Sequence, residues 1–302
     1  MRALVIGASG QVGAALSARL TDRQHEVVGT HSRVPQPGTR LLDLTAAAAT
    51  ERLIAETEPD WVFCPAGLTL VDYCEDHPDE AFRVNRDAPA VAAREAARHG
   101  AGFVYYSTEY VFDGKSGPYA EDDPVHAVSV YGQSKLGGER LALEANPRAL
   151  VIRTTVVYGP EPQGKNFVYQ LLRRARAGER MTVPADQRSS PTYNADLAAA
   201  TVELAERGHA GVLHVAGVEV LDRYAFARLA CEVFELDPGF LTPVTTAALG
   251  QRAARPLMAG LRVDRARAIL ATPLRPPRAG LGAMRRALDG ASIDTPSTGP
   301  VR

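Results

Sequence analysis

The stretch ALVIGASGQVG at residues 3–13 joins a short apolar run to a glycine-rich turn. Ala3–Ile6 predicts a β-strand, and the glycines follow it at once. Val12, Leu16 and Leu20 then recur at the spacing of one helix face, which predicts a helix. A strand, a tight turn and a helix in this order form the first part of a βαβ unit.

The three glycines of this turn, Gly7, Gly10 and Gly13, have the spacing GxxGxxG. In dinucleotide-binding turns the first glycine permits the turn, the second lets backbone N–H groups approach the pyrophosphate, and the third allows close packing of helix on strand. The N-terminus of the helix then faces the phosphates. We therefore expect a dinucleotide site at Gly7, Gly10, Gln11, Val12 and Gly13.

Short apolar runs alternate with helical patterns through the first half of the chain. Further strands are expected at Glu26–Val28, Trp61–Cys64, Phe103–Tyr106 and Leu150–Ile152, and helices at Asp79–Ala97 and about 130–144. This alternation predicts an α/β fold with a Rossmann doubly wound parallel sheet, in which ligands bind at the carboxyl ends of the strands.

The pattern becomes mixed after about residue 160, where helices are expected at Phe167–Ala177, Ala195–Glu206 and Tyr224–Phe234, and a strand at Val212–Val215. We predict a Rossmann domain over residues 1–160, with returns near 191–220. Residues 161–190 and 221–290 are expected to form a smaller, discontinuous C-terminal substrate lobe. Residues 291–302 hold Pro296 and Gly299 without apolar periodicity, which predicts a disordered tail.

The 302 residues carry a net charge of -1 and are 45% hydrophobic and 23% charged, which is ordinary for a soluble globular protein. This balance gives no general attraction to nucleic acid or to anionic membranes, so an anionic ligand must be held by local groups. Cys64, Cys74 and Cys231 lack a metal-binding spacing, so no metal is expected, and a sparse, odd set suits a reducing cytosol. The sequence shows neither a signal peptide nor an apolar run of about 20 residues. We therefore expect a soluble, cytoplasmic protein.

The segment after the second predicted strand reads Gly29-Thr30-His31-Ser32-Arg33 and contains no carboxylate. NAD sites of this fold usually place an acidic residue there for the ribose 2′-OH, whereas an arginine suits a 2′-phosphate. His31, Ser32 and Arg33 therefore favour NADP(H), although NAD(H) and a merely solvated arginine stay open. Asp43 and Leu44 are expected along the adenine edge, unless Asp43 simply caps the next helix.

Tyr131 and Lys135 lie four residues apart and hence on one face of a predicted helix. A phenol with an unperturbed pKa near 10 is a poor acid–base catalyst at neutral pH. A lysine ammonium one turn away stabilises the phenolate, so Lys135 is expected to lower the pKa of Tyr131. Ser107-Thr108, at the end of an earlier strand, places a hydroxyl where it can hydrogen-bond a carbonyl oxygen.

With these residues the chain resembles the extended short-chain dehydrogenase/reductase family, from the glycine turn to about residue 270. Within that family it is similar to the dTDP-4-dehydrorhamnose reductases and to the regulatory β subunit of methionine adenosyltransferase. The stretches that carry the likeness are Ser107–Gly114, Pro118-Tyr119, Val130–Lys135 with Gly138-Glu139, Arg153-Thr154, Val157–Gly159, Gly164–Phe167, Asp186-Gln187 and Pro191-Thr192.

The resemblance implies a catalytic triad of Thr108, Tyr131 and Lys135. Tyr131 would donate a proton to the developing alkoxide as NADPH delivers hydride, and Lys135 would also hold the nicotinamide ribose. Further positions implied to line the cofactor are Ala66, Gly67 and Thr69. Positions expected to face the substrate are Val71, Thr108, Glu109, Val156, Asn166 and Gln187.

Two positions depart from the family pattern: Glu109 replaces the common aspartate, and Val156 replaces a tryptophan expected to shape the sugar pocket. We therefore expect an NADPH-dependent reductase of a keto group on a nucleotide-activated deoxysugar, with dTDP-4-dehydrorhamnose itself in doubt as substrate. One alternative is a non-catalytic NADP-binding regulatory subunit of a partner enzyme. Another is a sugar-nucleotide epimerase or dehydratase, but Tyr110 stands where dehydratases carry a second carboxylate. A homodimer is left open.

Overall fold

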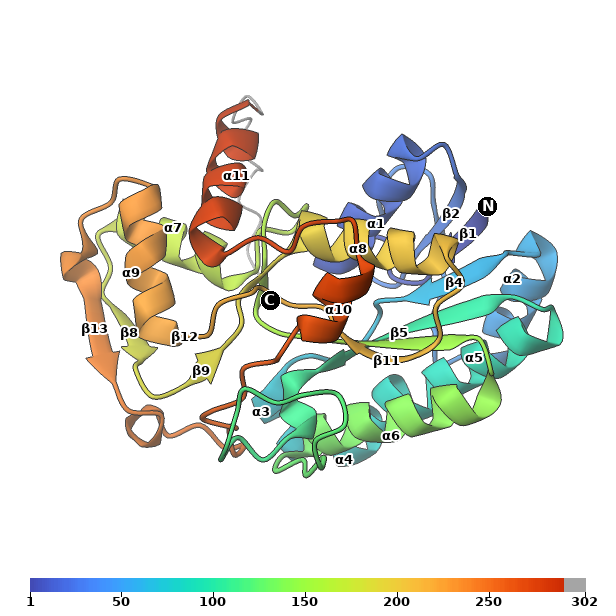
Figure 1. Cartoon of the computed structure of the whole chain (residues 1–302), viewed down its shortest axis with the longest axis horizontal. Coiled ribbons are helices and arrows are strands. Elements are labelled where there is room, and N and C mark those ends of the chain that lie inside the picture. Colours follow the sequence, from blue (N-terminus) through green and yellow to red (C-terminus); the bar gives the residue numbers. More distant parts are fainter. Residues whose placement is uncertain (291–302) are drawn as a thin grey trace.

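A seven-stranded, fully parallel sheet forms the centre of the computed structural model, which describes residues 1–290 (Figure 1). The predicted disordered tail at 291–302 lies outside the described residues. The strands lie in the order β11-β6-β5-β4-β1-β2-β3, and this order confirms the predicted Rossmann fold. Their bounds are β1 Arg2–Val5, β2 Glu26–His31, β3 Thr39–Leu41, β4 Trp61–Cys64, β5 Gly102–Thr108, β6 Ala149–Thr154 and β11 Gly211–His214.

Helices cover both faces of the sheet (Figure 1). They do so because successive residues of each strand point to opposite faces, and the residues on both faces are apolar. Trp61 and Phe63 of β4 pack toward α1, α8 and α10, whereas Val62 and Cys64 pack toward α2, α5 and α6. The first layer consists of α1 Gln11–Asp22, α8 Asn194–Glu206 and α10 Asp264–Ile269, and the second of α2 Ala47–Thr57, α5 Ala88–Arg98 and α6 Val130–Ala145.

The helix predicted over Asp79–Ala97 is interrupted, which the periodicity did not show. After α3 Val71–Asp76, it forms α4 Pro78–Phe82, a π-helical turn at Arg83–Asp87, and then α5. Pro89 has no N–H to donate to the carbonyl of Asn85 four residues earlier, and the Tyr105 hydroxyl donates to that carbonyl instead, at 2.6 Å. The turn therefore presents Asn85 to the strand ends, as π-bulges often do at functional sites.

A smaller lobe adjoins the carboxyl ends of the strands and has its own apolar core, which includes Tyr158, Leu171 and Phe226 (Figure 1). Its helices are α7 Phe167–Ala177, α9 Arg223–Val233 and α11 Pro277–Gly290. Its strand pairs are β8 Met181–Pro184 with β13 Leu241–Val244, β7 Val157–Tyr158 with β10 Thr192–Tyr193, and β9 Arg188–Ser189 with β12 Leu221–Asp222. Three short 3-10 turns are Glu109–Val111, Pro238–Phe240 and Ala247–Leu249.

The predicted domain boundaries stay a prediction, but one part of the predicted lobe packs elsewhere. Leu261, Val263 and Leu274 join the core on the α1 and α8 side of the main sheet. The chain therefore returns to the Rossmann sheet once more before α11. None of the helices in residues 1–290 is long and apolar enough to cross a membrane.

Candidate active site

The glycine turn between β1 and α1 has a different physical reason for each glycine. Gly7 has φ +98°, which L side chains rarely adopt. A Cβ on Gly13 would lie 2.1 Å from the Gly7 carbonyl oxygen, so the helix packs there directly on the turn. Gly10 has ordinary extended angles, and its Cβ would meet only the Gly7 oxygen at 3.4 Å. The space beside Gly10 therefore suits a ligand, as expected for the residue that a pyrophosphate approaches.

The N-terminus of α1 receives no side-chain cap, because its N-cap residue is Gly10. Its first N–H groups are thus available to phosphate oxygens. The Gln11 side chain instead donates to the Val157 carbonyl at 3.0 Å. Gln163, which the sequence analysis missed, donates to the Ser9 carbonyl at 3.0 Å. Both amides tie the glycine turn to the segment that leads into the lobe.

The end of β2 lies beside this turn. Thr30 accepts the Gly7 N–H through its hydroxyl at 3.1 Å and the Ala8 N–H through its carbonyl at 2.7 Å. The His31 ring is paired with the Thr39 hydroxyl at 2.7 Å, whereas Ser32 and Arg33 are exposed. Ser32 and Arg33 therefore keep their side chains available for a 2′-phosphate.

The two residues predicted for the adenine edge differ in environment. Leu44 is buried in the core beneath α2, whereas Asp43 is exposed. Asp43 accepts from the Thr45 hydroxyl at 2.7 Å and the Thr45 N–H at 2.9 Å, and these bonds lower its pKa. Asp43 stabilises the turn before α2 and is not its N-cap, which is Ala46.

A chain of close contacts leads from the glycine turn to the catalytic candidates. A Cβ on Gly7 would lie 3.1 Å from Ala66, at the end of β4. The next residue, Gly67, has its Cβ position 3.7 Å from the Lys135 Nζ. Asn85 fixes this loop, because its amide bonds both the N–H and the carbonyl of Leu68, at 2.8 and 2.9 Å. Thr69 is exposed at the outer end of the loop.

Tyr131 and Lys135 lie on one face of α6, as predicted, and both are buried. Thr108 ends β5, and its hydroxyl faces the Tyr131 phenol. The Tyr110 ring meets the Tyr131 ring edge-on, with the ring centres 5.4 Å apart. The Lys135 Nζ lies 4.1 Å from the centre of the Tyr105 ring, a cation–π contact. The fold thus brings the three predicted catalytic residues together at the carboxyl end of the sheet.

The protonation of these groups differs from the expectation in one respect. Burial raises the pKa of Tyr131 above its usual value, and the nearby Thr108 hydroxyl opposes that rise. The expected lowering by Lys135 does not appear: burial is the largest influence on the pKa of Tyr131, and Lys135 is not among the groups that shift it. Burial lowers the pKa of Lys135 to about 8, so its ammonium form still predominates at neutral pH.

Several buried polar atoms around this point have no hydrogen-bond partner within residues 1–290. They include the Ser107 Oγ, the Glu109 Oε2 and the Thr154 Oγ1, all at the carboxyl ends of β5 and β6. Buried polar groups are nearly always paired in folded proteins. Their clustering beside Thr108 indicates a site that receives polar groups from a ligand.

The predicted substrate residues Val71 and Asn166 have different environments. Val71, at the start of α3, packs in the same apolar cluster as Tyr131 and Tyr110, so the structure places it beside the catalytic candidates. Asn166 caps α7 by accepting from the Val168 N–H at 3.1 Å and donates to the Gly159 carbonyl at 2.9 Å. These bonds give Asn166 a structural role, whatever it does toward a ligand.

Val156 and Gln187 lie where the chain enters the lobe. Val156 has φ +40°, a strained conformation for a β-branched residue, and is half-buried against the lobe core. Gln187 donates to the Thr246 hydroxyl at 3.0 Å and accepts the Arg223 N–H through its carbonyl at 2.9 Å.

The sequence analysis missed two half-buried arginines on the lobe side, Arg223 and Arg255. Burial lowers the pKa of Arg223, the first residue of α9, while Tyr110 and Glu109 oppose that shift. Arg255 pairs with Asp72 of α3 at 2.9 Å, and its buried Nη1 has no hydrogen-bond partner among residues 1–290. The Ala253 N–H donates to Asp72 at 3.0 Å, so hydrogen bonds hold the segment around residues 253–255 against α3. No sequence motif around Arg223 or Arg255 predicts that either residue lies near the ends of the strands.

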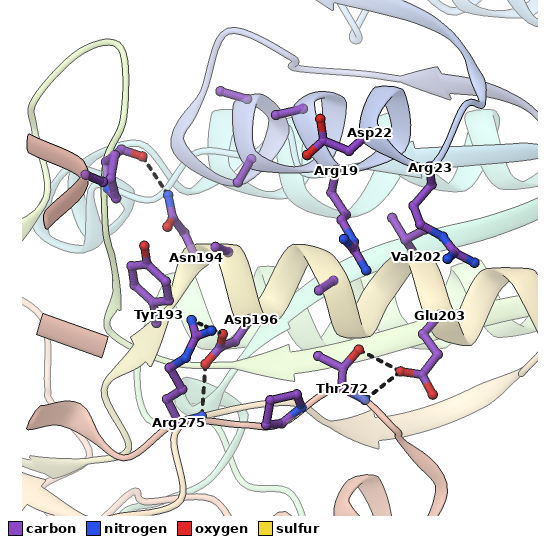
Figure 2. Close-up of a pocket in the computed structure, with 18 of the residues that line it drawn as sticks. Arg19, Asp22, Arg23, Tyr193, Asn194, Asp196, Val202, Glu203, Thr272 and Arg275 are labelled. Atoms are coloured by element: carbon purple, nitrogen blue, oxygen red, sulfur yellow. Dashed lines mark hydrogen bonds and ion pairs between the residues drawn. The ribbon is translucent and has the colours of Figure 1, made fainter. Parts of the chain in front are cut away.

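A cavity of about 1160 Å³ lies away from this site, between α1, α8 and residues 271–275 (Figure 2). Part of its charged lining is paired: Asp196 binds Arg275 at 2.8 Å, and Glu203 accepts from the Thr272 hydroxyl at 2.6 Å (Figure 2). None of the three catalytic candidates lines it. We therefore place the chemistry at the strand ends and not in this cavity.

A Rossmann sheet, a glycine turn and a Thr–Tyr–Lys set at the strand ends together define an extended short-chain dehydrogenase/reductase, an oxidoreductase class. The chain belongs to the family described as the RmlD substrate binding domain, whose model matches residues 1–289. This confirms the predicted family and enzyme class.

Curated relatives cover nearly the whole chain. A probable dTDP-4,6-dihydroxy-2-methyloxan-3-one 4-ketoreductase of Streptomyces antibioticus is 36% identical over 286 residues, 93% of each chain. The dTDP-4-dehydrorhamnose reductase of Mycobacterium tuberculosis is 37% identical and covers 98% of this chain and 97% of its own.

Solved structures agree with this assignment. A dTDP-4-dehydrorhamnose reductase from Clostridium acetobutylicum matches with TM-score 0.88 and 30% identity, over 96% of this chain and 100% of the other. The enzyme of that name from Bacillus anthracis, in complex with NADP, matches with TM-score 0.87 and 28% identity, over 95% and 99%.

Proposed function

We propose that this chain uses NADPH to reduce the keto group of a nucleotide-activated deoxysugar. One observation carries the proposal: the group formed by Thr108, Tyr131 and Lys135 lies next to the glycine turn. Gly67 contacts Lys135, and the preceding residue, Ala66, contacts Gly7 of the turn. Relatives that span the whole chain are named as reductases of such keto compounds, and a solved relative contains NADP. These names support both the reaction and the cofactor.

The residues of the turn fit the cofactor. The open space at Gly10 and the uncapped N-terminus of α1 would receive its pyrophosphate, and Ser32 with Arg33 its 2′-phosphate. Lys135, beside Gly67, would hold the nicotinamide ribose. When bound, NADPH supplies the hydride for the reduction.

The chain's own residues would bind and protonate the oxygen of the ketone. Thr108 and Tyr131 would hydrogen-bond this oxygen where negative charge develops, which lowers the barrier. Tyr131 would then give its proton to the oxygen and complete the alcohol. The Lys135 ammonium, one helical turn away, would stabilise the tyrosinate left behind. Burial of all three keeps water from competing for these hydrogen bonds.

A direct assay tests the proposal. We would follow NADPH oxidation with dTDP-4-dehydrorhamnose and with dTDP-4,6-dihydroxy-2-methyloxan-3-one, the two keto compounds named for relatives. We expect turnover of at least one, and the second to be preferred because Val156 stands where the family resemblance implies a tryptophan that shapes the sugar pocket. Failure to oxidise NADPH with either compound would contradict the proposal. The homodimer that the sequence leaves open is to be tested by light scattering, and the predicted cytoplasmic location stays a prediction, to be tested by cell fractionation.

A further inference from the structure

Glu109 is a buried carboxyl group at the catalytic end of the sheet that the reduction does not use. It follows Thr108 directly, is 5% exposed, and its Oε2 has no hydrogen-bond partner within residues 1–290. Burying a carboxyl oxygen without a hydrogen-bond partner is costly, so the position of Oε2 needs a reason. The groups that face it are Thr155 after β6, Arg223 of α9, Tyr110 beside it and Tyr131 of α6.

The neighbouring hydroxyls make the setting chemically specific. Thr108 and Tyr131 are placed to hydrogen-bond a ketone oxygen, and donors on that oxygen stabilise an enolate as well as an alkoxide. A ketone held in this way loses a proton more readily from the carbon next to its carbonyl. A carboxylate beside a hydroxyl pair is one arrangement by which enzymes remove such a proton. Glu109 is the buried carboxyl group that adjoins Thr108 and Tyr131.

We propose that Glu109 acts as a base on the carbon next to the keto group, so that this chain also exchanges that carbon's hydrogen with solvent. The inference rests on the proposed function, because it needs a ketone in the site. The C–H bond breaks and its proton passes to the Glu109 carboxylate. The C–H electron pair becomes the enolate double bond, and the carbonyl π pair moves to the oxygen held by Thr108 and Tyr131. Return of a proton from Glu109 restores the ketone, and no oxidant or reductant is consumed.

The ionisation of Glu109 suits this role. Burial raises its pKa to about 8, against the opposing effects of the Thr155 hydroxyl and the Arg223 guanidinium. Acid and carboxylate forms are therefore both populated near neutral pH, which a group that takes and returns a proton requires. Exchange should rise with pH until the carboxylate form dominates. Arg255, which faces Tyr110 next to this group, adds positive charge on the same side.

The experiment separates exchange from reduction. The full chain is incubated in deuterated buffer with NADP⁺ instead of NADPH, so no hydride can be transferred. The probes are dTDP-4-dehydrorhamnose and dTDP-4,6-dihydroxy-2-methyloxan-3-one, and a sample without protein gives the background. Mass spectrometry and NMR measure deuterium on the carbons that flank the carbonyl. We expect incorporation above background into the probe that NADPH reduces.

Two variants assign the exchange. Glu109→Gln keeps the size of the side chain but removes the base, so the ratio of exchange to reduction should fall about 10²-fold or more. Glu144→Gln changes an exposed glutamate of α6 and should leave that ratio unchanged. A circular dichroism spectrum of each variant checks folding.

The outcomes distinguish the two proposals. Reduction without deuterium incorporation, or exchange that survives Glu109→Gln, overturns the role of Glu109 but leaves the reductase intact. Exchange without reduction that depends on Glu109 supports the base and contradicts the reductase. Absence of both reactions overturns both proposals.

Discussion

The substitution Gly10→Ala separates cofactor binding from folding. Gly10 has φ -84° and ψ 171°, angles that any residue adopts, and an added Cβ would have only the Gly7 oxygen within contact, at 3.4 Å. The free protein should therefore tolerate alanine, apart from the loss of a slightly better N-cap residue. A bound pyrophosphate would meet the new methyl group.

The cost to binding follows from overpacking. An inserted methyl group in a close-packed site costs about 1–3 kcal/mol, which corresponds to about 5- to 150-fold in the NADPH dissociation constant. Isothermal calorimetry or nucleotide fluorescence measures that constant, and thermal unfolding measures stability. We expect weaker binding with the Tm of the unliganded protein lowered by only a few degrees.

Gly13→Ala provides the matched control. Its Cβ would lie 2.1 Å from the Gly7 oxygen and 2.8 Å from the Ala8 Cα, so the backbone must move even without a ligand. A cost of about 1–3 kcal/mol then appears as a Tm lowered by about 2–4 °C per kcal/mol. If Gly10→Ala binds NADPH as tightly as the wild type, the pyrophosphate does not lie at this turn.

Four other perturbations test the remaining assignments. Arg33→Ala should raise the NADPH dissociation constant about tenfold or more and hardly change that of NADH, because a charge-assisted hydrogen bond is worth about 1.5–3 kcal/mol; equal weakening of both would refute the 2′-phosphate role. Tyr131→Phe should lower turnover at least about 10²-fold with little change in NADPH affinity, and a variant that keeps more than about a tenth of the rate would show that Tyr131 is not the acid. Val156→Trp should shift preference toward dTDP-4-dehydrorhamnose or block the pocket, whereas efficient turnover of that compound by the wild type would contradict the premise. Burial lowers the pKa of His214 to about 3, so the neutral ring favours the folded state and stability should fall as pH drops below about 6.5, by about 1.4 kcal/mol per pH unit; urea unfolding of the wild type and His214→Gln at pH 7 and 5 measures this, and equal slopes would exclude His214.

Much of the fold was predictable from local pattern. The strand Trp61–Cys64 and the helix Phe167–Ala177 have the predicted bounds, because an all-apolar run and a capped amphipathic stretch each carry their own signal. The strand β3 at Thr39–Leu41 was missed because it is short, lies at the sheet edge and has little apolar character. The π-helical turn was missed because the donor that replaces the missing N–H of Pro89 is the Tyr105 hydroxyl, which bonds the carbonyl of Asn85, 20 residues away in the sequence.

The candidate site divides in the same way. Gly7, Gly10, Tyr131 and Lys135 could be named because each belongs to a short motif whose spacing alone sets its geometry. Arg223 and Arg255 could not, because each follows a loop of the lobe and reaches the strand ends only through packing between distant segments. Nothing in the sequence around Arg223 and Arg255 distinguishes them from solvated surface arginines.

The sequence by itself determined the class of fold, the glycine turn and the spacing of the tyrosine and lysine, since these depend on neighbours within a few residues. Only the tertiary structure decided which polar groups are buried together. Glu109 acquires its raised pKa, and Val156 its φ of +40°, from the packing of the lobe against the ends of β5 and β6. Desolvation and backbone strain depend on everything that surrounds a residue, and that environment is assembled from segments distant in the sequence.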